Sequence, residues 1–127
     1  MSLALTITQD LYHAMEQGNI GKIFSLLDQT FVIQGPIGTD RNGKEGVLDI
    51  ISSLYRQGKG IKKEIDHFIE HENMVIVLGN IYMNQASSAA VKMPFVDIWK
   101  LQDNKITELQ YFYQDPPLLA RHLNHKD

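Results

Sequence analysis

One carboxylate stands out in this sequence because large apolar side chains flank it at strand spacing. Phe95 and Trp99 lie two residues before and two residues after Asp97. Alternate residues of a strand share a face, so we expect Asp97 to face a core or a cavity. Burial disfavours the charged form of an acid, which predicts a neutral Asp97 that donates a hydrogen bond or a proton to a carbonyl or oxyanion. The alternative is a purely structural hydrogen bond to a neighbour.

His67 is the second candidate catalytic residue, because it shares strand parity with Ile65 and Ile69. Its imidazole titrates near neutral pH, and across a sheet from Asp97 it would act as an acid–base partner. The alternative is a core histidine whose hydrogen bonds are satisfied by its neighbours.

Polar and aromatic residues on other strands complete a predicted pocket. Asn80 and Tyr82 on one strand, and Tyr111 and Tyr113 on another, are expected to point inward. Apolar walls with a few polar groups are typical of small-molecule sites, although tyrosines also fill cores. A bulge at Gly79 would reverse the facing of Asn80 and Tyr82. The candidate ligand-binding residues are Trp99, Tyr111, Tyr113, Tyr82, Asn80, Phe95, Leu11, Met15 and Leu54.

Other chemistries lack the residues that they require. The chain has no cysteine, which excludes disulfides and a thiol nucleophile. His122 and His125 have no carboxylate partner nearby, so neither a metal site nor a cofactor is expected. A net charge of −3 makes nucleic acid an unexpected partner. Lys59, Lys62 and Lys63 are balanced by neighbouring acids, which predicts a solvated face.

Hydrophobic periodicity predicts the elements that position these residues. The expected order is α-α-β-α-β-β-β-β, in one α+β domain over residues 1–127 with a curved antiparallel sheet packed on three helices. Such a concave sheet leaves a cone-shaped cavity. The expected helices are Ile7–Met15, Ile20–Leu27 and Val47–Leu54, and the strands are Phe31–Gly35, Ile61–Glu72, Met74–Asn84, Val91–Leu101 and Lys105–Gln114.

The distribution of charged and apolar residues also predicts the cellular location and the oligomeric state. The N-terminus has neither a basic segment nor a long apolar run, so we expect no signal peptide, no membrane association and a cytoplasmic protein. On the opposite parity of the strands, Val96, Ile98, Ile106 and Phe112 are apolar. A solvated sheet face should be more polar, which predicts a twofold homodimer through this face.

Two segments of the chain carry a resemblance to a known family. With this element order, EQGNIGKIFSLLDQTFVIQGPIG and MPFVDIWKLQDNKITELQYFYQD resemble the SnoaL-like and ketosteroid-isomerase-like branch of the NTF2-like superfamily. The resemblance runs from about Thr8 to Asp115 and implies a cystatin-like cone that commonly forms homodimers. It specifies the fold far better than the reaction, because this superfold hosts isomerases, dehydratases, cyclases, epoxide hydrolases and non-enzymes.

The resemblance places the isomerase's catalytic set on this chain only in part. Asp97 falls where the isomerase keeps an oxyanion-hole aspartic acid neutral in an apolar site. Gly35 replaces the proton-abstracting aspartate, and Leu11 replaces the oxyanion-hole tyrosine, with Tyr12 one residue out of step.

A second relative, limonene epoxide hydrolase, needs a buried Asp–Arg–Asp set together with a tyrosine and an asparagine that hold water. The resemblance places Tyr111, Asn80, Tyr82, Ile33 and Gly35 at these positions. No arginine is available on these strands, which disfavours epoxide hydrolysis.

Two functions therefore remain. The first is binding of a small hydrophobic molecule in the cone without chemistry, which the missing base at Gly35 slightly favours. The second is a cofactor-independent enzyme of the polyketide-cyclase or isomerase type, in which Asp97 is the general acid or hydrogen-bond donor.

Overall fold

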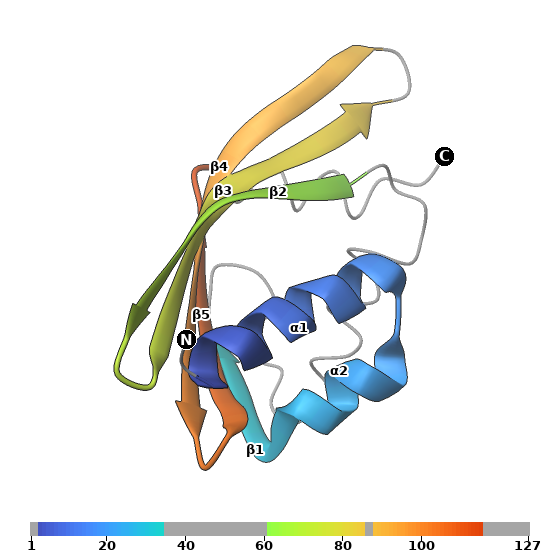
Figure 1. Ribbon diagram of the computed structural model, residues 1–127. Coiled ribbons are helices and arrows are strands. Elements are labelled where there is room, and N and C mark those ends of the chain that lie inside the picture. Colours follow the sequence, from blue (N-terminus) through green and yellow to red (C-terminus); the bar gives the residue numbers. More distant parts are fainter. Residues whose placement is uncertain (1–2, 35–60, 86–87, 116–127) are drawn as a thin grey trace.

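The computed structural model describes residues 3–34, 61–85 and 88–115. These residues form two helices followed by five strands (Figure 1). The predicted third helix, Val47–Leu54, lies outside the described residues, and so does the candidate Leu54. The elements are α1 (Leu3–Gln17), α2 (Ile20–Leu26), β1 (Leu27–Gln34), β2 (Ile61–His71), β3 (Met74–Gln85), β4 (Ser88–Gln102) and β5 (Lys105–Tyr113).

The five strands form one curved sheet in the order β1-β5-β4-β3-β2. The last four strands pair antiparallel with their neighbours in sequence, as predicted. The first strand, β1, pairs in parallel with β5, so the sheet is mixed and the expectation of a wholly antiparallel sheet is wrong. A parallel neighbour needs a long crossover, and here β2, β3 and β4 lie within the chain between the two paired strands.

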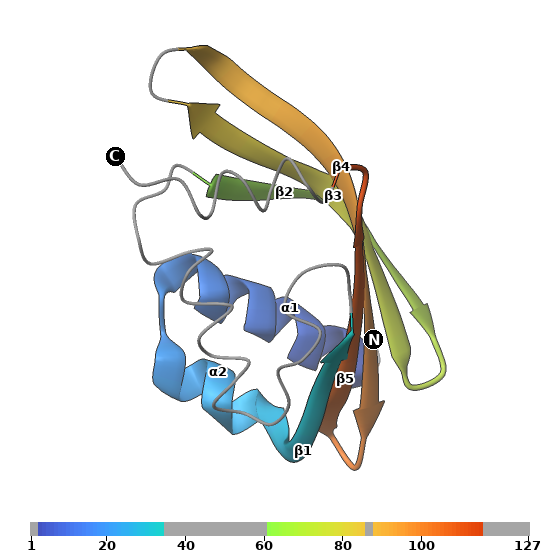
Figure 2. The same ribbon diagram turned by 180° about the vertical axis from the view of Figure 1, so that it is seen from behind.

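Both described helices lie on the same, concave side of the sheet (Figures 1 and 2). The first helix, α1, ends where predicted: Gly18 has a φ of 69°, a left-handed conformation that favours glycine. The next helix, α2, begins after Asn19, whose side chain accepts a hydrogen bond from the Lys22 backbone N–H at 3.2 Å. Neither of these helices is long and apolar enough to cross a membrane.

The core lies between the helices and the concave face of the sheet, which we call the inner face. On β4 the alternation is as predicted: Met93, Phe95, Asp97, Trp99 and Leu101 are all buried. This strand therefore carries Asp97 into the core with an aromatic residue on each side.

One expected member of the opposite face is placed wrongly. Ile106 is fully buried in the core, although it was predicted to lie with Val96, Ile98 and Phe112. The pairing of β4 with β5 shifts by one residue between Lys100 and Leu101. A one-residue shift turns the side chains beyond it to the other face, and this shift brings Ile106 inward.

Candidate functional site

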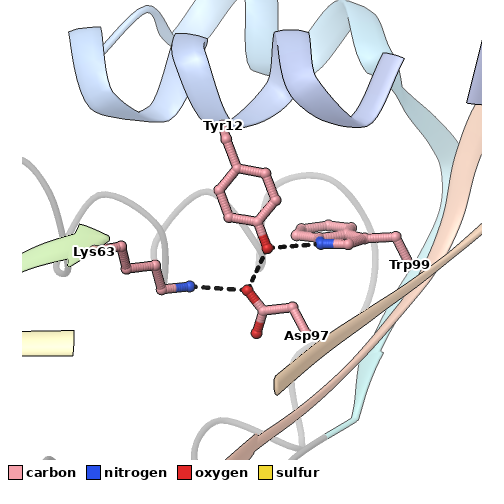
Figure 3. A network of polar contacts seen from close by, with 4 residues as sticks. All are labelled: Tyr12, Lys63, Asp97 and Trp99. Atoms are coloured by element: carbon pink, nitrogen blue, oxygen red, sulfur yellow. Dashed lines mark hydrogen bonds and ion pairs between the residues drawn. The ribbon is translucent and has the colours of Figure 1, made fainter. Parts of the chain in front are cut away.

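A buried polar cluster connects α1 to the inner face of the sheet (Figure 3). Its members are Tyr12 from α1, Lys63 from β2, and Asp97 and Trp99 from β4. Asp97 and Trp99 are each 1% exposed, and the side chain of Lys63 is 9% exposed. Charged side chains are rarely this buried unless they are paired, and here the two charges face each other.

The contacts fix the direction of each hydrogen bond. The Trp99 indole Nε1–H, which can only donate, lies 2.8 Å from the Tyr12 hydroxyl oxygen. The single hydroxyl hydrogen of Tyr12 is therefore directed to Asp97 Oδ2. Lys63 Nζ donates to the same oxygen over 3.0 Å. Two donors thus converge on Oδ2, and one of them carries a positive charge.

The second carboxylate oxygen is in a different situation. Asp97 Oδ1 is buried and has no hydrogen-bond partner in the described part of the chain. In Figure 3 it points away from both Tyr12 and Lys63. Buried polar atoms are nearly always paired, so Oδ1 marks a place where a bound molecule could supply the missing partner.

Two aromatic rings lie close to the ammonium group of Lys63. Its Nζ lies 4.6 Å from the ring centroid of Phe95 and 5.7 Å from that of Tyr12. The Tyr12 ring in turn packs edge-on against Phe68 and Trp99, each at a centroid distance of 5.8 Å. Ring faces attract cations and exclude water, so the ion pair lies in a mostly apolar environment.

The approach of β2 to the core depends on Gly79 of the neighbouring strand. A Cβ atom at this position would lie 2.2 Å from the backbone oxygen of Glu64 and 2.9 Å from Cε1 of Phe95. Residue 79 must therefore be glycine for β2 and the Phe95 ring to lie so close. Gly79 is opposite Ile65, two residues beyond Lys63, so this contact helps to position the lysine.

His67 does not lie where the sequence predicted. Its side chain is exposed, whereas Phe68, the next residue, packs against the core. The pairing of β2 with β3 shifts between Ile65 and His67, which leaves Asp66 as an extra residue on β2. This bulge reverses the parity, so the expectation that His67 faces Asp97 is wrong.

Asn80 and Tyr82 also lie on the opposite, outer face. The inward residues of β3 are Val75, Val77, Gly79 and Ile81, of which the three with side chains are fully buried. Asn80 Nδ2 donates to Asp66 at 3.3 Å, and the Tyr82 hydroxyl donates to Glu64 at 3.3 Å. Because β3 is apolar on both parities, its sequence does not reveal which face is buried. The possible reversal at Gly79 does not occur, because β3 pairs with β4 without a register shift from Met74 to Met83 and the same parity faces inward on both sides of Gly79.

The other predicted residues in the described part of the chain lie in or against the core. Tyr111 is 3% exposed and lies directly opposite Asp97 in the sheet. Tyr113 is half-buried, with its ring centroid 5.1 Å from that of Tyr111. Phe95 and Trp99 of β4 and Leu11 and Met15 of α1 are buried in the same core.

Sequence reasoning missed two members of the cluster. Lys63 was assigned to a solvated face, although its parity with Ile65 gave a signal for the inner face. Tyr12 was considered only because it lies one residue away from the position of the isomerase's oxyanion-hole tyrosine. Its spacing of four residues from Thr8, which is also buried, places both on one side of α1.

A second feature of the surface is a cleft of about 170 Å³ between the start of α1 and two hairpin turns. None of the cluster residues lines it, and it holds no unpartnered buried side-chain atom among the described residues. The described residues also include no group of three side chains that could together hold a metal ion. The lining residues are Leu3, Ala4, Ile7, Glu72, Asn73, Leu101, Gln102, Asp103 and Asn104.

Comparison with known families matches residues 8–109 to the SnoaL-like domain. The chain belongs to the SnoaL-like domain family. Its fold is therefore NTF2-like, an α+β fold with a curved mixed sheet, as the resemblance implied. A comparison with curated protein sequences finds no match.

Solved structures with low sequence identity share this fold. An NTF2-like protein from Cytophaga hutchinsonii is 21% identical, with a TM-score of 0.73 and coverage of 89% of this chain and 91% of that one. TerC, co-crystallized with polyporic acid, is 18% identical, with a TM-score of 0.77 and coverage of 98% and 100%. A protein from Jannaschia sp. CCS1 described as a SnoaL-like polyketide cyclase is 14% identical, with a TM-score of 0.78 and coverage of 98% and 94%.

Proposed function

We propose that this protein binds a small, largely apolar organic molecule between α1 and the inner face of the sheet, with Asp97 as its polar anchor. The observation that carries the proposal is the buried Asp97 Oδ1, which has no partner in the described part of the chain. Phe95, Trp99 and Tyr111, all buried beside it in the sheet, would supply apolar contacts. Apolar walls around a few directed polar groups are the usual composition of a ligand site.

The cost of the buried ion pair supports a functional reason for it. Removing two charges from water is expensive, and apolar side chains of similar size would often stabilise a core equally well. The Lys63–Asp97 pair is therefore a poor choice for stability alone. An anchoring role for a ligand explains both the buried charges and the unpartnered oxygen.

Two relatives of the same fold support the ligand class. The structure of TerC was obtained with polyporic acid, and the Jannaschia protein is described as a polyketide cyclase. Their low identity shows the fold alone, so the small-molecule class comes to this chain as part of the proposal.

The second candidate is a cofactor-independent enzyme in which Asp97 exchanges a proton with the ligand. The observation that favours it is the contact of buried Asp97 with two proton-carrying groups, the Tyr12 hydroxyl and the Lys63 ammonium, because general acid–base chemistry needs such groups within hydrogen-bond reach. His67 takes no part in this version, because it lies on the other face of the sheet.

The binding proposal is tested with three hydroxyaryl probes of increasing size: phenol, 2-naphthol and 4-phenylphenol. Trp99 is the only tryptophan of the chain, so its indole N–H gives one assigned NMR signal inside the cluster. We expect at least one probe to shift this signal and to release or absorb heat in calorimetry. The double variant Lys63→Met/Asp97→Leu should lose this binding, while Lys92→Met on an exposed position keeps it. Absence of a shift with all three probes would overturn the proposal.

We also propose that the outer face of the sheet is the interface of a homodimer. Two rows of neighbouring side chains support this: Ile69, Ile76 and Ile98 in one row, and Leu78, Val96 and Phe112 in the other. Phe112 is 54% exposed and Ile69 is 45% exposed, which is unfavourable for residues facing water. Light scattering at micromolar concentration should give twice the monomer mass, and Phe112→Asp should halve it. A monomeric wild type would overturn this part.

A further inference from the structure

We infer that Asp97 meets its ligand as a carboxylate acceptor fixed by Lys63, and that the ligand is therefore a neutral compound with a weakly acidic hydroxyl, such as an enol or phenol. This inference rests on the proposed binding function and goes beyond it by naming the ligand's chemistry. It also reverses the role expected from the sequence, in which a neutral Asp97 donates to an oxyanion.

Oδ2 of Asp97 is held by contacts within the protein. This oxygen receives hydrogen bonds from the Tyr12 hydroxyl and from Lys63 Nζ. A protonated Oδ2 would present a hydrogen to two donors, which is unfavourable, and a proton on Oδ1 would leave the Lys63 ammonium facing a neutral group. A carboxylate that accepts from both donors fits these contacts best. The ammonium group also neutralises the carboxylate inside the core, so the Lys63–Asp97 pair carries no net charge.

Oδ1 of Asp97 is the atom left for the ligand. On an ionised carboxylate both oxygens are acceptors only, so a ligand atom that satisfies Oδ1 must carry a hydrogen. An ether or carbonyl oxygen would leave Oδ1 unpaired at the cost of a buried polar atom. A carboxylate ligand would add an uncompensated charge to a neutral buried pair, which is worse still. The site thus selects neutral donors over acceptors and over anions.

We assign Lys63 as a positioning residue. Its ammonium contacts Asp97 and lies over the Phe95 ring, so it acts on the ligand through the carboxylate. Without Lys63, Asp97 loses the charged donor that holds Oδ2 in place, so Oδ1 is no longer fixed toward a ligand hydroxyl. The preference for ligands that donate should then weaken.

The experiment compares three ligands that share one ring system: 2-naphthol, 2-methoxynaphthalene and 2-naphthoate. Calorimetry at pH 7 should show 2-naphthol binding at least about tenfold more tightly than its methyl ether, because the ether loses a hydrogen bond to a charged acceptor. The anion 2-naphthoate should bind most weakly. Equal affinity for the naphthol and its ether, or tightest binding of 2-naphthoate, overturns the inference but leaves the proposed binding function intact. If none of the three binds and the indole signal does not shift, it is the proposed function that fails.

Variants of Lys63 test its part separately. In Lys63→Met the ratio of naphthol to ether affinity should fall toward one, and in Lys63→Arg, which keeps the charge, it should be largely retained. Lys92→Met, the same substitution at an exposed position, should keep the wild-type ratio. A ratio unchanged in Lys63→Met overturns the positioning role. If Lys63→Met does not fold, the ligand order in the wild type and the Lys63→Arg ratio decide the matter.

Discussion

Two cross-strand lysine–carboxylate pairs lie on opposite faces of the same sheet. On the inner face Lys63 and Asp97 are 3.0 Å apart, with side chains 9% and 1% exposed. On the outer face Lys100 and Glu108 are 3.4 Å apart, with side chains 46% and 22% exposed. Both pairs join an ammonium group to a carboxylate, but the two pairs differ in their exposure to solvent. Burial, more than the type of contact, distinguishes a candidate site from an ordinary surface pair.

Removing the lysine of each pair should give the largest difference in stability loss between the two faces of the sheet. Lys63→Met leaves Asp97 as an uncompensated buried charge, so the free energy of unfolding should fall by about 3–5 kcal/mol. Lys100→Met removes a partly exposed pair, and the loss should be within about 0–1 kcal/mol. Urea denaturation followed by circular dichroism measures both. Similar losses for the two variants would contradict the contrast.

A double variant separates the ion pair from the packing of its side chains. Lys63→Met/Asp97→Leu replaces both charges by apolar groups, and buried pairs replaced in this way are often as stable as the original or more so. We therefore expect the double variant to recover most of the stability lost in Lys63→Met. A double variant less stable than the single one would show that the pair stabilises the fold.

Stability should depend on the close approach of β2 to β3 nearly as strongly as it depends on the inner ion pair. Gly79→Ala places a Cβ atom 2.2 Å from the Glu64 backbone oxygen, which forces the strands apart. Overpacking of this kind typically costs about 1–3 kcal/mol. Asn80→Ala, the adjacent residue on the outer face, is the matched control and should change stability by less than about 0.5 kcal/mol. Thermal unfolding of both variants checks the difference, and a neutral Gly79→Ala would rule out the proposed steric role.

The smallest contrast compares two tyrosine hydroxyls. Tyr12→Phe deprives the buried Trp99 Nε1–H of its acceptor and Asp97 of a donor, which should cost about 1–3 kcal/mol. Tyr82→Phe removes a hydroxyl that contacts Glu64 on the outer face, and the change should stay within about 0.5 kcal/mol. Urea denaturation of both variants tests this difference. Equal losses of stability would contradict it.

The sequence predicted the site best where one strand alternates cleanly. On β4 apolar residues occupy one parity around Asp97, and the structure buries all of them. The four antiparallel strands and the end of α1 at Gly18 were also predicted, because hairpin order and glycine conformation are local properties of the chain.

The errors have physical causes that one sequence does not reveal. His67 was misplaced by a bulge at Asp66, and Asn80 and Tyr82 by a strand that is apolar on both faces. The parallel pairing of β1 with β5 depends on a contact between segments far apart in the chain. Lys63 was missed because its burial depends on its pairing with Asp97, a tertiary contact.

We expect a neutral hydroxyl compound to complete the contacts of Asp97. The most direct test is a crystal structure of the protein with 2-naphthol. We predict the naphthol oxygen at about 2.5–3.0 Å from Asp97 Oδ1, a normal distance for a hydroxyl donating to a carboxylate, with the Lys63 and Tyr12 contacts to Oδ2 retained. Naphthol in the cleft at the start of α1, or naphthol beside the cluster with its hydroxyl turned away from Oδ1, would contradict the account.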